Sequence, residues 1–149
     1  ARMREVLARI LREYGAQLVI NYAPAEREAA VELYEAMGRP SGMFIDVEAR
    51  GLRQLGALLS NAGFFFGNEG GARHMAQAFG LPCFAIYPPQ VSLRKWLPHP
   101  GERNRHVSPR DYLSSDEWNR LTDAERFDTL TVDRVWAALR PMLAACLRH

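Results

Sequence analysis

Four short apolar runs alternate along this 149-residue chain with segments whose apolar residues repeat at the helical period. The runs are QLVIN (17–21), MFIDV (43–47), FFFG (64–67) and CFAIY (83–87). Runs of this length, separated by helices of about ten residues, are typical of parallel strands that helices cover on both faces. The alternation therefore predicts an α/β domain built on a parallel sheet.

Helices are expected before, between and after these strands. Their predicted positions are 3–14, 25–37, 52–59, 71–80, 115–121 and 131–147. Pro141 is expected to kink or shorten the last helix. The segment after Pro88 is too long for a tight connection and is predicted to be a functional loop, either ordered or mobile, with RHVSP (105–109) as a short edge strand beyond it. The chain opens with a helix and without an initiator methionine, so we expect a fragment.

The composition limits the partners and the compartment. The 19 basic and 17 acidic residues are spread along the chain, so no basic stripe indicates nucleic acid. The apolar runs fall well short of the roughly 18 residues of a transmembrane segment, which predicts a soluble chain that could still touch a membrane surface. Cys83 and Cys146 lack metal-ligand spacing and are expected to be reduced core thiols of a cytosolic protein, a disulfide being the alternative.

One glycine-rich turn, in the stretch GFFFGNEGGARHMAQAFGLP (63–82), joins an expected strand to an expected helix. Ligands of open α/β sheets bind at such turns, at the carboxyl ends of the strands. Gly70 and Gly71 would leave the N–H groups at the helix start bare, which predicts an anion site. The spacing matches neither the dinucleotide fingerprint nor the Walker loop. The alternative is that the glycines only permit a tight turn.

The side chains around this turn suggest which anion it holds. One face of the expected helix carries the apolar residues Ala72, Met75, Ala76 and Phe79, which we expect to face the sheet. His74 lies off that face in the first turn, as a phosphate ligand or a surface histidine. Arg73 could reach the same anion or be solvated. Glu69 would repel phosphates unless it points elsewhere, for instance at sugar hydroxyls, and this combination suggests a nucleotide-sugar.

The segment GNEGGARHMAQAFGLPCFAIYPP (67–89) resembles the signature of glycosyltransferase family 9, the lipopolysaccharide heptosyltransferase family. The residues that fit the signature in register are Glu69, Gly70, Gly71, His74, Ala76, Ala78, Gly80 and Pro82. The resemblance implies a Rossmann-like three-layer domain, the C-terminal half of a GT-B fold. Residues 1–149 would then form a single nucleotide-sugar-binding domain, without the N-terminal acceptor domain.

The resemblance also implies roles for individual residues. Glu69 would contact hydroxyls of the donor sugar, Gly70 and Gly71 would present backbone to the diphosphate, and His74 would bind a phosphate oxygen. Glu26 is the nearest match to the acidic residue that contacts the nucleoside ribose, with Glu28 as a competitor and a solvated glutamate as the alternative.

Three positions depart from the family pattern. Glu69 replaces the common aspartate, Gly70 replaces a hydroxyl residue, and Arg73 stands where an apolar residue is frequent. These departures leave the identity of the sugar open. The long loop carries Arg94, Lys95 and Trp96. This part of the loop could place a positive charge near the cleft, or it could be an ordinary solvated loop.

The activity implied by the resemblance is inverting, metal-independent transfer of a sugar to a glycolipid acceptor of the lipopolysaccharide core type. An ADP-sugar is the favoured donor, heptose from ADP-heptose being one option, and no cofactor is expected. The general base belongs to the missing domain, so we expect no catalytic residue and no turnover in this chain. The location would be cytoplasmic, a peripheral position at the inner membrane being one option. The alternatives are a sugar-nucleotide epimerase-like GT-B enzyme and a non-catalytic nucleotide-binding module.

Overall fold

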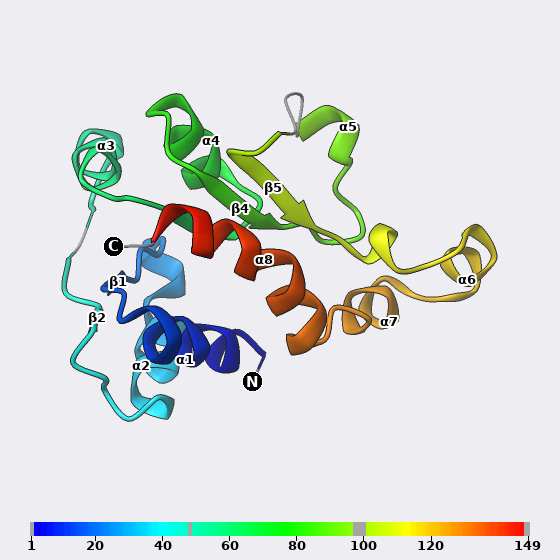
Figure 1. Ribbon diagram of the computed structural model, residues 1–149, viewed down its shortest axis with the longest axis horizontal. Coiled ribbons are helices and arrows are strands. Elements are labelled where there is room, and N and C mark those ends of the chain that lie inside the picture. Colours follow the sequence, from blue (N-terminus) through cyan, green and yellow to red (C-terminus); the bar gives the residue numbers. More distant parts are fainter. Residues whose placement is uncertain (1, 48, 97–100, 148–149) are drawn as a thin grey trace. The chain divides into compact units, whose positions relative to one another are not determined.

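The computed structural model describes residues 2–47, 49–96 and 101–147, a mixed α/β chain with small parallel sheets (Figure 1). The chain divides into two compact units, Ala1–Leu55 and Gly56–His149, which are described separately. Among the described residues, no helix has the length and apolar character needed to cross a membrane.

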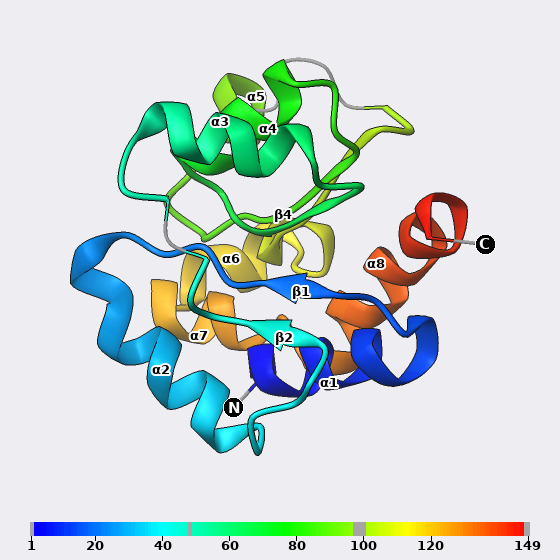
Figure 2. The ribbon, with the colours of Figure 1, turned by 90° about the vertical axis from the view of Figure 1, so that its left-hand side faces the viewer.

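The first unit contains two helices and a two-stranded parallel sheet. Its elements are α1 (Arg2–Tyr14), β1 (Leu18–Val19), the 3-10 turn η1 (Pro24–Glu26), α2 (Arg27–Ala36), β2 (Met43–Phe44) and the start of α3 (Leu52–Ser60). Figure 2 shows β1 and β2 side by side, with Leu18 opposite Met43. Helix α1 buries Val6, Leu7 and Ile10 on one face. Both strands are shorter than the five-residue apolar runs that predicted them.

The second unit is built on a three-stranded parallel sheet of order β3-β4-β5. Its remaining elements are β3 (Phe65–Asn68), α4 (Gly71–Ala78), β4 (Cys83–Ile86), α5 (Leu93–Trp96), β5 (Asn104–Val107), the 3-10 turn η2 (Pro109–Asp111), α6 (Ser115–Arg120), α7 (Asp123–Asp128) and α8 (Val132–Cys146). The central strand β4 is buried along its whole length. In Figures 1 and 2, α4 and α8 lie on opposite faces of this sheet.

The predicted parallel pairing of the strands is confirmed, and the edge strand expected near residue 105 is β5. The described strands form two sheets rather than the one that the alternation predicted. Helix α8 runs without interruption from Val132 to Cys146, so Pro141 does not shorten it. The two cysteines are free thiols, as predicted, and burial raises the pKa of the Cys83 thiol to about 11.

The orientation of α4 corrects one prediction. The expected inward face included Phe79, yet Phe79 is 50% exposed, and the buried residues of this helix are Arg73 and Ala76. Burial of the Arg73 guanidinium is possible because a carboxylate from the end of β3 lies against it. The inward face of α4 therefore combines Ala76 of the predicted stripe with the ion-paired Arg73.

Candidate anion site at the start of helix α4

The turn between β3 and α4 leaves bare backbone at the carboxyl end of the sheet. The Glu69 N–H still pairs with the carbonyl of Ile86, at 3.0 Å, and the chain then passes through an extended Gly70 into the helix. No side chain caps α4, because Gly70 stands at the N-cap. Among the residues that the structure describes, no acceptor binds the N–H groups of Gly71 and Ala72. These donors lie at the positive end of the helix dipole.

The fold itself does not require glycine at these two positions. Neither Gly70 nor Gly71 has a backbone conformation that disfavours other residues, and a Cβ atom added to either would meet nothing within 4 Å. Gly15, in contrast, has a φ of +58° and does need the freedom of glycine. The conformation of the turn therefore gives no support to the alternative that Gly70 and Gly71 only permit a tight turn.

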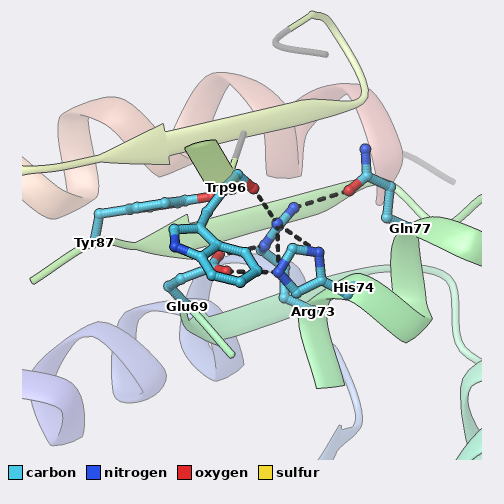
Figure 3. A network of polar contacts seen from close by, with 6 residues as sticks. All are labelled: Glu69, Arg73, His74, Gln77, Tyr87 and Trp96. Carbon is cyan, nitrogen blue, oxygen red and sulfur yellow. Dashed lines mark hydrogen bonds and ion pairs between the residues drawn. The ribbon is translucent and has the colours of Figure 1, made fainter. Parts of the chain in front are cut away.

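The Glu69 side chain points inward and holds two basic residues of the first helical turn (Figure 3). Only 6% of it is exposed, and 1% of the Arg73 side chain. Glu69 Oε2 lies 2.5 Å from Arg73 Nε in an ion pair that lacks hydrogen-bond geometry. Glu69 Oε1 lies 2.8 Å from His74 Nε2. The alternative of a solvated Arg73 is therefore wrong.

The rest of the Arg73 guanidinium is also occupied within the protein. Its Nη1 donates to Gln77 Oε1 at 2.9 Å, and its Nη2 donates to the carbonyl of Trp96 at 2.5 Å. The same carbonyl accepts a hydrogen bond from the Tyr87 hydroxyl at 3.2 Å. Because a buried guanidinium must find acceptors for its donors, these contacts fix where the segment that carries Trp96 lies.

Both ring nitrogens of His74 face protein groups, although 38% of the side chain is exposed. Nε2 faces the Glu69 carboxylate, which can only accept, so Nε2 carries the hydrogen. Arg73 Nη2, a donor, lies 3.0 Å from Nδ1 and 3.2 Å from Nε2, and with the hydrogen on Nε2 the nitrogen left to accept is Nδ1. The ring of Trp96 meets the imidazole edge-on, with 5.6 Å between the centroids. A phosphate that bound His74 would have to replace one of these contacts.

Tyr87 lies fully buried beneath this cluster, one residue beyond β4. Burial, followed by a hydrogen bond with Glu69, raises the pKa of its phenol far above the ordinary value. The hydroxyl therefore stays protonated at any ordinary pH and is always available as a donor.

The other predicted residues lie apart from this cluster or at its margin. Glu26 and Glu28 are exposed residues of the first unit, and Glu26 Oε2 accepts a hydrogen bond from the Ala23 N–H at 2.9 Å. Their contact with a ribose stays a prediction. Lys95 Nζ lies 5.0 Å from the centre of the Trp96 ring, so it is next to the cluster, while residues 97–100 of the same loop lie outside the described residues.

Sequence reasoning missed Gln77, Tyr87 and the carbonyl of Trp96. A signal existed for the first, because Glu69, Arg73 and Gln77 follow one another at intervals of four residues, the spacing that brings side chains together along a helix. Among the described residues, no group of three or more His, Cys, Asp or Glu side chains could hold a metal ion.

Comparisons with family models, with curated proteins and with solved structures each found no match. The resemblance of residues 67–89 to the family 9 signature therefore stays a prediction.

Proposed function

We propose that this chain is the donor-binding domain of a nucleotide-sugar-dependent glycosyltransferase and that the first turn of α4 holds the diphosphate. The observation that carries the proposal is the bare backbone at Gly70 and Gly71, where the fold needs no glycine and two N–H groups lack an acceptor among the described residues. Diphosphates bind to such helix starts because the N–H groups and the helix dipole both favour negative charge.

The position of the turn supports the same proposal. It follows β3 at the carboxyl end of a parallel sheet, where ligands of α/β domains bind, and it would form part of a Rossmann-like half of a GT-B enzyme. Negative charge on the nucleoside diphosphate grows as it leaves the sugar, so donors fixed at this turn would stabilise the transition state more than the ground state.

The geometry changes the role that we assign to Glu69. Its carboxylate is buried against Arg73 and His74, and a contact with sugar hydroxyls would require it to leave both. We therefore assign Glu69 to positioning: it compensates the charge of Arg73 and fixes the tautomer of His74. The sugar, heptose or another, and the glycolipid acceptor remain those that the resemblance implies.

Calorimetry with ADP and with ADP-ribose tests this proposal. In Gly71→Val, a branched side chain would stand over the N–H groups of the first turn, and we expect binding to be lost. The fold should tolerate the change, because valine is a better helix former than glycine and a Cβ atom there meets nothing within 4 Å. Gly63→Val is the matched control, since that glycine is equally open but precedes β3. Equal affinities in the wild type and both variants would show that the turn is not a phosphate site.

A further inference from the structure

We propose that α5 acts as a latch on the candidate anion site at the start of α4, and that the latch is closed in this structure. A diphosphate binds after Trp96 gives up its contacts with Arg73 and His74. This inference rests on the proposed function, because it describes how access to the same site is controlled. It goes beyond that function by assigning an inhibitory role to Trp96 and Tyr87.

Two contacts close the latch. The carbonyl of Trp96 takes the hydrogen bond from Arg73 Nη2, and the ring of Trp96 stands edge-on against His74 (Figure 3). The segment therefore contacts both basic side chains in the first turn of α4. A phosphate oxygen that bound Arg73 Nη2 would have to displace the Trp96 carbonyl.

Release of Trp96 should require only a moderate free energy. Helix α5 contains no buried residue, and Trp96 itself is 42% exposed, so little apolar surface holds its end down. The base of the segment is better anchored, because Val91 and Leu93 pack against the buried residues Ala85 and Tyr87. These contacts place the fixed point near residue 93 and the moving part at Trp96.

A phosphate group is a suitable replacement for the carbonyl that leaves. The Nη2 donor of Arg73 is buried and cannot be left without an acceptor, and a charged phosphate oxygen accepts more strongly from a guanidinium than a neutral carbonyl does. The exchange conserves the number of hydrogen bonds to Arg73. The phosphate oxygen thus replaces the Trp96 carbonyl as the acceptor for Arg73 Nη2, so the anion enters as Trp96 is released.

The closed state should lower the apparent affinity for anions. If the open state is the minor one, the apparent dissociation constant exceeds the intrinsic one by the ratio of closed to open molecules. The Tyr87 hydroxyl donates to the Trp96 carbonyl, and among the described residues it makes no hydrogen bond with the N–H groups of Gly71 and Ala72. Removing that hydroxyl should weaken the latch and leave those N–H donors unchanged. It also removes the hydrogen bond with Glu69, which keeps Arg73 and His74 as its partners.

The test is titration of the full chain with inorganic pyrophosphate and with ADP. We expect Tyr87→Phe to bind both about fivefold more tightly than the wild type, which is the effect of one neutral hydrogen bond. Trp96→Ala, which removes the ring from His74, should also bind more tightly. Tyr112→Phe is the matched control, because it removes a hydroxyl that donates to the backbone carbonyl of Arg134 in α8, and its affinity should not change.

Fluorescence gives a readout that does not depend on Tyr87→Phe folding. Pyrophosphate should change the emission of the wild type as Trp96 moves, and this change should be missing in Trp96→Phe. Wild-type binding that Gly71→Val abolishes, with no gain in Tyr87→Phe or Trp96→Ala, would overturn the latch and leave the phosphate site standing. No binding to any of these proteins would overturn both.

Discussion

Replacement of Arg73 by methionine should destabilise the chain strongly, because Arg73 is an almost fully buried charge whose partner is also buried. The substitution keeps most of the side-chain volume but removes the ion pair with Glu69 and the hydrogen bonds to Gln77 and the Trp96 carbonyl. Breaking a buried pair from one side costs about 3–5 kcal/mol, since the remaining charge is left uncompensated. That is a large part of the roughly 5–15 kcal/mol by which domains are stable.

A double-mutant cycle separates the ion pair from simple packing. Arg73→Met/Glu69→Gln has no unpaired charge and keeps an acceptor for His74, so it should recover about 2 kcal/mol or more of the loss. Urea titrations followed by circular dichroism give the free energies of unfolding, and the slopes should agree among variants. Arg53→Met, at an exposed arginine of α3, is the control and should change stability by less than about 0.5 kcal/mol. A loss below about 1 kcal/mol for Arg73→Met, or strict additivity in the double variant, would refute the reasoning.

Two further predictions concern His74 and Asp111. His74→Ala should lower the free energy of unfolding by about 1–2 kcal/mol, because the buried Glu69 Oε1 loses its donor. His74→Gln should lower it less, since the amide of glutamine can donate to the same oxygen. Equal losses of the two variants in urea titrations would contradict this. Burial acts to raise the pKa of Asp111, but His106, whose Nε2 lies 3.7 Å from Oδ1, and hydrogen bonds from Ser108 outweigh it and hold that pKa below its ordinary value. A lowered pKa in the folded state means that the stabilisation is complete above the unfolded-state pKa and is lost as the pH falls through the folded-state value. Asp111→Asn should therefore make stability fall less steeply with decreasing pH below about pH 4. Melting temperatures that fall as steeply with pH in the variant as in the wild type would count against this prediction.

The strands of the second unit could be predicted because their signals are local. The apolar runs at 64–67 and 83–87 became β3 and β4, since a short run bounded by turn residues has few other solutions. Helix α7 was missed, although Thr122 and Glu125 form a capping box at its start, with the Thr122 N–H donating to Glu125 at 2.8 Å. That signal was present in the sequence and was not used.

The site was less predictable than the sheet. Counting only apolar residues placed Phe79 on the inward face of α4 and left Arg73 off it, because a paired arginine can be buried as well as a methionine. The contact of Tyr87 and Arg73 with the Trp96 carbonyl joins residues far apart in sequence, and it depends on the path of the loop rather than on any side-chain pattern. No spacing rule reports such a contact.

The anchoring of Trp96 through its main chain has a practical consequence for scanning and labelling. The carbonyl that Arg73 and Tyr87 bind is present whatever residue stands at position 96. An alanine scan of the loop would therefore measure the effect of the aromatic ring but not that of the backbone carbonyl. The same property makes position 96 a good place for a cysteine that carries a spectroscopic probe, because replacing the side chain leaves the backbone carbonyl that Arg73 and Tyr87 bind.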